Sequence, residues 1–201
     1  FHGAGGLEVT DAMALMIAAQ ACLPVLRLGL AYYAGFVGIV VHPDEVVAQR
    51  SVMDDDGIVH EYAENLTGEA MSGGPLMLAW ADVDDAAEAA ELAYNVVIHE
   101  FAHVIDMASG LADGVPPLPD AAARERWIAV IDAEYEAFCR RVDAGADTVV
   151  DPYGAEAVEE FFAVAVEAFF VAAVPFRCES PALYALLAGY FRGASVDIGN
   201  E

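Results

Sequence analysis

The chain contains no lysine. Its only basic residues are 8 arginines, set against 33 aspartates and glutamates among 201 residues, and the formal net charge is −25 at pH 7. A chain of this composition cannot assemble the basic patch that meets nucleic-acid phosphates. Binding to an anionic membrane surface is unexpected for the same reason. The acidity is better explained by solubility, or by a salt-adapted proteome, than by a functional acidic surface.

Cysteine is also scarce. Cys22, Cys139 and Cys178 are odd in number and have no CxxC spacing, so they predict neither a disulfide framework nor a zinc ribbon and favour a reducing compartment. The first ten residues have neither the basic nor the apolar region of a signal peptide. Uncharged runs such as Leu28 to Val41 are shorter than the ~20 residues that a membrane-spanning helix needs. We therefore expect a cytoplasmic protein.

Hydrophobic residues, in contrast, make up 58% of the chain, and the mean hydropathy is +0.44. This length and composition suit one domain over residues 1–201 with a sizeable core. Three segments in the first half predict strands, the second of them after a turn at Asp54 to Gly57: Phe36 to His42, Ile58 to Ala63 and Leu76 to Trp80. Leu76 to Trp80 is either an edge strand that pairs with substrate or an ordinary interior strand.

Helical patterns dominate the second half. The predicted helices are Thr10 to Leu28, about Ala93 to Ala108, Ala121 to Val142, Glu156 to Val174 and Pro181 to Phe191. The segment Asp82 to Glu91 is a loop or a short helix. The sequence thus predicts an α+β fold, with a small sheet from the first half and a mostly helical second half.

The segment around residue 100 carries the strongest chemical signal. His99-Glu100-Phe101-Ala102-His103 is an HExxH pattern within an apolar helix. Residues four apart lie on one helix face, so His99 and His103 can direct two imidazole nitrogens at one zinc ion. Glu100 is then placed to act as general base. A chance match on a core helix is the alternative, although buried ionisable groups are costly unless they are paired or bind a metal.

A catalytic zinc needs a third protein ligand. His2 is terminal, His42 precedes a proline, and His60 and Glu64 lie in a predicted strand where residues four apart stand roughly 13 Å apart. A carboxylate from a later helix is therefore favoured.

Spacing alone prefers Glu160 as the ligand, with Glu167 supporting it. The alternative is that Glu160, like Glu156 and Glu159, points toward solvent. Asp106 either orients a histidine or simply marks the helix end.

Beyond these patterns, the chain resembles the MtfA (Mlc titration factor A) family, zinc peptidases of the gluzincin kind that are distantly similar to the protease domain of anthrax lethal factor. The resemblance spans nearly the whole chain. It rests on Asn95 to Met107 with Gly110 to Pro117, and on Phe1 to Thr10, Ala18 to Cys22, Asp56-Gly57, Gly68 to Ala70, Gly74-Pro75, Trp80, Pro152-Tyr153 and Glu160 to Val164. The family's segment before the Phe-x-Gly stretch, and any extended C-terminal tail, are expected to be absent.

The resemblance implies a zincin-like metallopeptidase, with an aminopeptidase-like activity on peptide or protein substrates. It implies zinc bound by His99, His103 and Glu160, Glu100 as the catalytic acid and base, and Tyr153 as the active-site tyrosine. Enterobacterial members of the family bind the repressor Mlc. A second possibility is therefore a protein that sequesters a transcriptional repressor and uses zinc structurally. An intact Glu100 argues against that reading, because a structural zinc needs no base.

Overall fold

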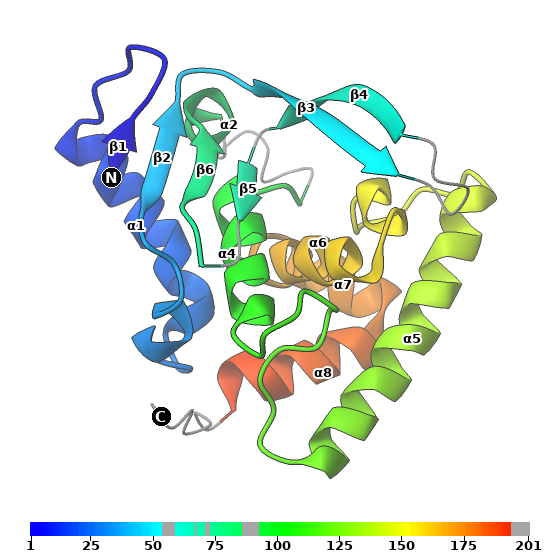
Figure 1. Ribbon diagram of the computed structural model, residues 1–201. Helices are drawn as coiled ribbons and strands as arrows, with labels where there is room; N and C mark the ends of the chain where they lie inside the picture. Colours follow the sequence, from blue (N-terminus) through cyan, green and yellow to red (C-terminus); the bar gives the residue numbers. More distant parts are fainter. Residues whose placement is uncertain (54–58, 67, 71–72, 86–92, 194–201) are drawn as a thin grey trace.

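The computed structural model describes residues 1–53, 59–66, 68–70, 73–85 and 93–193. Strands come from the first half of the chain and helices make up most of the second half, so the predicted α+β fold is confirmed (Figure 1). None of the helices in the described part of the chain is long and apolar enough to cross a membrane.

The main sheet has four strands in the order β1 (His2–Gly3), β2 (Ile39–His42), β6 (Leu76–Ala79) and β5 (Gly68–Ala70). β1, β2 and β6 run parallel, and β5 pairs with β6 in the antiparallel sense. β6 therefore lies between two neighbours, and the interpretation of Leu76 to Trp80 as an edge strand is wrong. The edge on this side is β5, and Trp80 already begins α2 (Trp80–Asp84).

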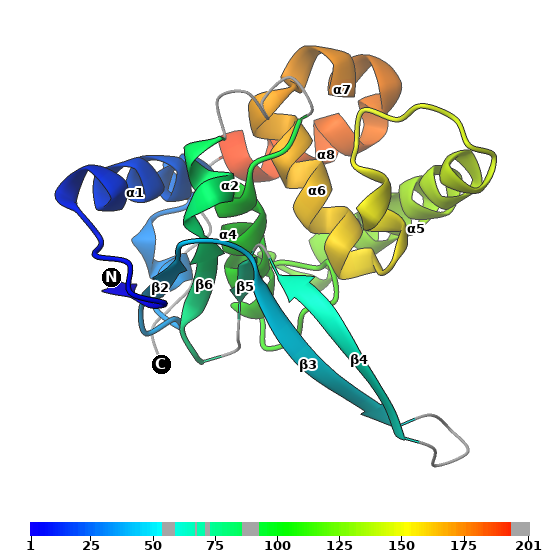
Figure 2. The ribbon, with the colours of Figure 1, turned by 90° about the horizontal axis from the view of Figure 1, so that it is seen from above.

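A separate two-stranded ribbon joins β3 (Val46–Met53) to β4 (Val59–Leu66), with Val46 opposite Leu66 and Met53 opposite Val59. Figure 2 shows this ribbon extending away from the rest of the chain. The sequence predicted only β4, as Ile58 to Ala63. β3 was missed because its polar centre, Gln49 to Ser51, interrupts the apolar pattern. The predicted turn at residues 54–57 lies outside the described residues, as does most of the segment 82–91.

α1 (Asp11–Val25) begins where the sequence predicts, because the Thr10 hydroxyl accepts a hydrogen bond of 3.3 Å from the Met13 amide. It ends at Val25, three residues earlier than predicted. A short 3-10 turn, η1 (Leu30–Tyr33), leads from α1 toward β2, which begins at Ile39 and not at Phe36.

α4 (Val96–Met107) lies between two apolar clusters, which explains its hydrophobic composition. Val97 and Phe101 belong to a cluster with residues of α1, β2 and β6. Ile98 and Ile105 belong to a second cluster with residues of the C-terminal helices. Two opposite faces of α4 are thus fixed by packing, and its remaining side is left for the polar residues at positions 99, 100 and 103.

The C-terminal half contains α5 (Ala121–Asp143), η3 (Pro152–Ala155), α6 (Val158–Val171), α7 (Ala173–Glu179) and α8 (Pro181–Arg192). The helix predicted from Glu156 to Val174 is thus two helices, and Glu156 precedes the first. The break falls at Ala172, whose backbone (φ −124°, ψ 42°) is not helical. Pro175 explains it, because proline has no amide to donate and its ring would clash with the Val171 carbonyl in a continuous helix.

Candidate metal centre

Asn95 fixes the start of α4 and connects it to two other helices. Its side-chain oxygen accepts a 2.9 Å hydrogen bond from the Ile98 amide, and its side-chain nitrogen donates to Gln20 of α1 at 2.7 Å. Its backbone amide donates to a Glu167 carboxylate oxygen of α6. These hydrogen bonds fix the rotation of α4 about its axis, and its position along that axis, relative to α1 and α6. They do so at the turn that carries His99.

Three side chains from α4 and α6 converge on one point. His99, His103 and Glu160 each offer one ligand atom, and these atoms lie within 4.8 Å of one another. The two imidazole Nε2 atoms are 3.2 Å apart, and Glu160 Oε2 lies 3.2 Å from His99 Nε2 and 3.4 Å from His103 Nε2. The structure thus brings together the three residues that the sequence singled out as ligands.

These separations fit a tetrahedral metal ion. Ligand atoms at about 2.0–2.1 Å from a tetrahedral ion are about 3.3–3.4 Å apart, close to the three distances observed between the Nε2 and Oε2 atoms. Two imidazoles and one carboxylate also match a common donor set of catalytic zinc. The residues present therefore fit a metal ion, with a fourth position left open.

Glu167 supports this arrangement by a hydrogen bond to the other ring nitrogen of His99. Its Oε1 accepts a 2.7 Å hydrogen bond from His99 Nδ1, and its side chain is only 2% exposed. With the proton held on Nδ1, the Nε2 lone pair of His99 is directed at the point shared with His103 and Glu160.

The carboxylate of Glu100 is buried beside this cluster. Glu100 is 5% exposed, and its Oε2 has no hydrogen-bond partner among the described residues. Burial raises its pKa to about 7. Gly68 of β5 faces this side chain so closely that a methyl group at Gly68 would overlap it. The sequence showed the Gly68 to Ala70 stretch only as a match to a family pattern, and no local signal indicated this contact.

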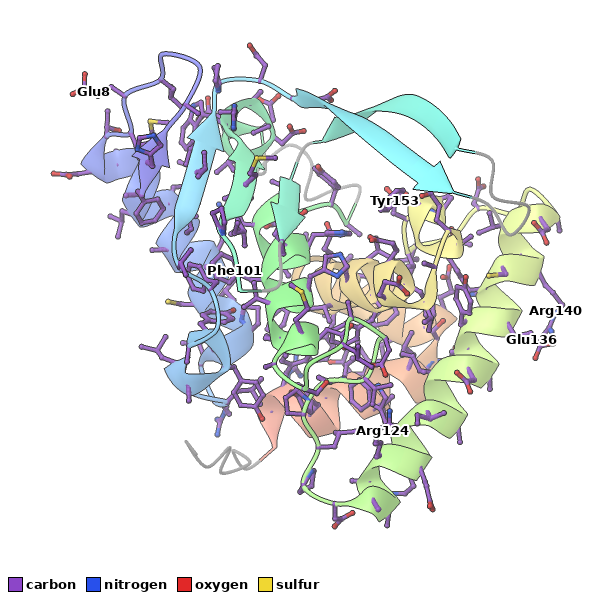
Figure 3. The ribbon with its side chains drawn as sticks, viewed as in Figure 1. Glu8, Phe101, Arg124, Glu136, Arg140 and Tyr153 are labelled. Carbon is purple, nitrogen blue, oxygen red and sulfur yellow. The ribbon has the colours of Figure 1, made fainter. Side chains whose placement is uncertain are left out.

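Tyr153 of η3 is on the same side as His99. The two ring centroids are 6.2 Å apart, and Tyr153 is 43% exposed. Figure 3 shows Tyr153 on η3, close to α6. The Asp151 carboxylate accepts a 2.8 Å hydrogen bond from the Tyr153 amide. Gly154 packs so tightly on α6 that an added methyl group would meet Val164 and the Phe161 backbone, so η3 is fixed against the helix that carries Glu160.

Residues 1–192 match the model of the glucose-regulated metallo-peptidase M90 family. The chain belongs to the M90 metallopeptidase family.

The M90 chain is similar to curated proteins of several bacteria. It is 37% identical over 193 residues to Mlc titration factor A of Edwardsiella ictaluri, an alignment that covers 92% of this chain and 71% of that protein. It is 35% identical over 156 residues to an uncharacterized protein of Synechocystis, with 77% and 57% covered. For Mlc titration factor A of Salmonella arizonae the identity is 37% over 123 residues, with 60% and 48% covered. The chain thus spans from about half to about seven tenths of these relatives' length, and the resemblance to the MtfA family is confirmed.

Asp106 of the M90 chain forms no hydrogen bond with His99 or His103. It is fully buried, and its Oδ2 accepts a 2.8 Å hydrogen bond from the Gly114 amide. Gly114, whose φ is +72°, accepts a 2.8 Å hydrogen bond at its carbonyl from the indole of Trp127. Asp106 therefore ties the end of the metal-centre helix to the loop of residues 108–120, and through it to α5.

The charges of the M90 site are strongly coupled. Burial lowers the pKa of His99, but hydrogen bonds to Glu160 and Glu167 outweigh it and raise the pKa well above the usual value. Burial acts to raise the pKa of Glu160, but His103 and His99 hold it well below the usual range. The site thus favours a positive charge between these groups, and a bound metal ion has to displace a proton there.

Other sequence candidates do not join the cluster. Among the described residues, His99, His103 and Glu160 are the one group placed to hold a metal. Glu156 is exposed before the start of α6, and Glu159 is half-buried outside the group. The side chains of His60 and Glu64 lie outside what the structure describes.

Proposed function

We propose that this M90 chain is a zinc-dependent, aminopeptidase-like metallopeptidase that hydrolyses peptide bonds, with His99, His103 and Glu160 as the zinc ligands. The observation that carries the proposal is the spacing of about 3.3 Å among their three ligand atoms, next to a buried carboxylate. Zinc is proposed over harder cations because two of the three ligands are imidazoles. Zinc in such a site supplies a Lewis acid that polarises the scissile carbonyl and acidifies a water molecule.

Glu100 is proposed as the general base and acid. Its buried carboxylate has an unpartnered oxygen and a pKa of about 7. A group of this pKa can take the proton of the attacking water near neutral pH and then deliver it to the leaving amine. The close approach of Gly68 to Glu100 supports this role, because β5 restricts where the carboxylate can lie.

Tyr153 is proposed as the donor to the developing oxyanion. Its ring is near His99 and is partly exposed, so its hydroxyl can reach a substrate without serving as a ligand. β5 is an edge strand of the main sheet and lies next to Glu100. An extended peptide substrate could pair with this strand by backbone hydrogen bonds.

A repressor-binding protein is the second candidate function. Two of the relatives reported above carry the name Mlc titration factor A. In this candidate the chain sequesters a transcriptional repressor, and zinc serves a mainly structural role. Glu100 is buried, and its Oε2 has no hydrogen-bond partner among the described residues. This favours the peptidase, because a structural site has no use for a base at that cost.

The decisive experiment replaces Glu100 by glutamine and measures metal content by elemental analysis together with turnover of a panel of aminoacyl chromogenic substrates. The peptidase proposal expects about one zinc per chain in both proteins and a loss on the order of 10³-fold in rate for Glu100→Gln. The exposed Glu156→Gln is the matched control and should behave as the parent chain. Equal rates in Glu100→Gln and the parent would refute the assignment of the base. No hydrolysis by the zinc-loaded parent chain would favour the repressor-binding function.

A further inference from the structure

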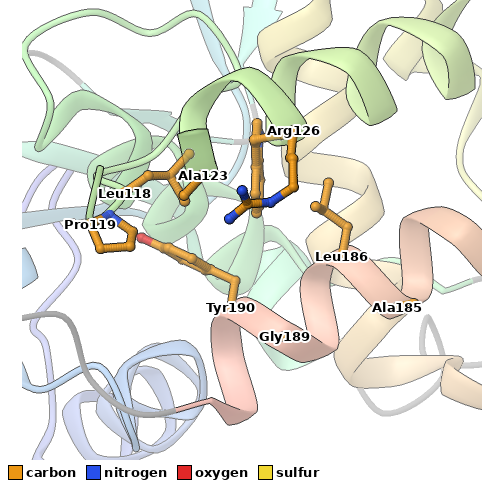
Figure 4. A pocket seen from close by; sticks show the side chains of 9 residues that line it. Leu118, Pro119, Ala123, Arg126, Ala185, Leu186, Gly189 and Tyr190 are labelled. Atoms are coloured by element: carbon orange, nitrogen blue, oxygen red, sulfur yellow. The ribbon is translucent and has the colours of Figure 1, made fainter. Parts of the chain in front are cut away.

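A pocket lies between α5 and α8, away from the metal centre. Its volume is about 320 Å³. Its walls are mostly apolar and include Leu118, Trp127, Leu186 and Tyr190, and Arg126 lies at its side (Figure 4). None of the residues assigned to the metal centre lines it. This volume is at the small end of the range for pockets that bind small molecules.

Arg126 is the one arginine of α5 without an ion pair in the described part of the chain. Arg124 pairs with Asp113 at 3.5 Å, and Arg140 pairs with Glu136 at 2.6 Å on the outer side of α5. Arg126 has no ion pair and no hydrogen bond to any residue in the described part of the chain, although acidic residues outnumber arginines by 33 to 8. In Figure 4 its guanidinium group extends over the pocket toward Tyr190. The simplest alternative is an arginine stem that only covers apolar surface.

The walls of the pocket are held in place without any ligand. Trp127 is 1% exposed, and its indole nitrogen donates a 2.8 Å hydrogen bond to the Gly114 carbonyl. Its ring is 5.3 Å from the ring of Tyr190, at an angle of 64°. Tyr190 is 7% exposed and also packs edge-on against Phe191. A ligand that enters such a pocket spends little free energy on ordering side chains.

From these observations we propose that the pocket between α5 and α8 binds a small organic carboxylate with an apolar body, whose charge pairs with Arg126. The apolar walls require an apolar body, and the single guanidinium group matches one carboxylate. A multiply charged anion is disfavoured, because the net charge of −25 repels it and no second cation lines the pocket. This site is independent of the proposed peptidase activity.

The test uses octanoate as the probe and its neutral amide, octanamide, as the matched ligand. Binding is measured by calorimetry and by the tryptophan fluorescence of the zinc-loaded chain, to which Trp127 and Trp80 both contribute. Octanoate should bind saturably, with a Kd of about 1 mM or tighter for a ligand of this size. Arg126 is exposed, so Arg126→Gln should weaken octanoate binding by up to about fivefold, the upper end for an exposed ion pair, and should leave octanamide binding unchanged. Arg124→Gln, two residues away and outside the pocket, is the control.

A second variant tests the location. Gly189 of α8 lines the pocket, and a β-carbon built there meets no atom within 4 Å. Gly189→Leu should therefore fill the pocket and abolish binding of both ligands without straining the helix, which circular dichroism checks. The proposal is overturned if octanoate shows no saturable binding in the millimolar range, if Arg126→Gln does not change octanoate affinity, or if folded Gly189→Leu binds as well as the parent. The Arg126→Gln result stands by itself if Gly189→Leu fails to fold.

Discussion

Gly68 of β5 faces the side chain of Glu100. The backbone of β5 passes so close to this side chain that there is no room for a β-carbon at position 68. The two residues are 32 positions apart in the sequence, and only the packing of β5 against α4 brings them together. Glu100 is also buried, and its Oε2 has no hydrogen-bond partner in the described part of the chain, so the orientation of its side chain depends on this contact.

Replacing Gly68 by alanine should therefore displace the Glu100 carboxylate. We expect zinc content to remain near that of the parent chain, because none of the three proposed ligands is touched. Turnover should fall on the order of 10²-fold, the effect of a catalytic group misplaced by about 1 Å. Gly38→Ala is a suitable control, because a methyl group at Gly38 meets no atom within 4 Å. An unchanged rate in Gly68→Ala would mean that Glu100 tolerates the shift or is not the base.

Glu160→Ala should weaken zinc binding markedly, because only two protein ligands would remain at the site. Glu159→Ala and Glu156→Ala are neighbouring controls and should retain the metal, since neither belongs to the ligand group. Elemental analysis after dialysis against a weak chelator distinguishes the three variants. Full occupancy in Glu160→Ala, with loss in one of the controls, would show that a different carboxylate binds the metal.

Tyr153→Phe should fail in a different way. The ring that packs near His99 is kept, so fold and zinc content should be unchanged. The variant loses one hydrogen bond to the oxyanion, and turnover should fall on the order of 10²-fold, mainly in kcat. Loss of zinc in this variant would instead identify Tyr153 as a ligand, and an unaltered kcat would remove it from the catalytic machinery.

Asp106 should make the chain's stability depend on pH. Burial raises its pKa from 3.8 to about 6, so the folded state binds the proton more tightly than the unfolded state. Stability contributed by the protonated carboxyl is present at low pH and is lost as pH rises through about 6. Asp106→Asn carries no such charge. Its free energy of unfolding, relative to the parent, should therefore rise by about 1.4 kcal/mol between pH 5 and 7.5.

Urea unfolding of the two chains, both stripped of metal, measures this difference. Other titrating groups are common to the two chains, so their contributions largely cancel. A difference that does not change between pH 5 and 7.5 would show that burial does not raise the pKa of Asp106. A difference that rises as the pH falls below about 4 would show that the ionised carboxylate is stabilised by its hydrogen bond from Gly114.

Much of the chain could be predicted because its signals are local. Thr10 caps α1 as expected, and α5 and α8 agree with their predicted ranges to within one residue at each end. The errors occur where one local signal outweighs another. β3 was missed because of its polar centre, and Pro175 divides the predicted helix from Glu156 to Val174. Trp80 was assigned to a strand, although it begins a helix.

The sequence by itself determined the histidine pair and the adjacent glutamate, because a spacing of four residues on a helix places His99 and His103 on one face wherever that helix lies. The tertiary structure alone decided which distant groups meet them. The packing of α6 against α4 places Glu160 3.2 Å from His99 and Glu167 behind it, and β5 places Gly68 against Glu100. Such contacts follow from how whole helices and strands cross, and this depends on the complete set of core side chains and not on the spacing within any one segment.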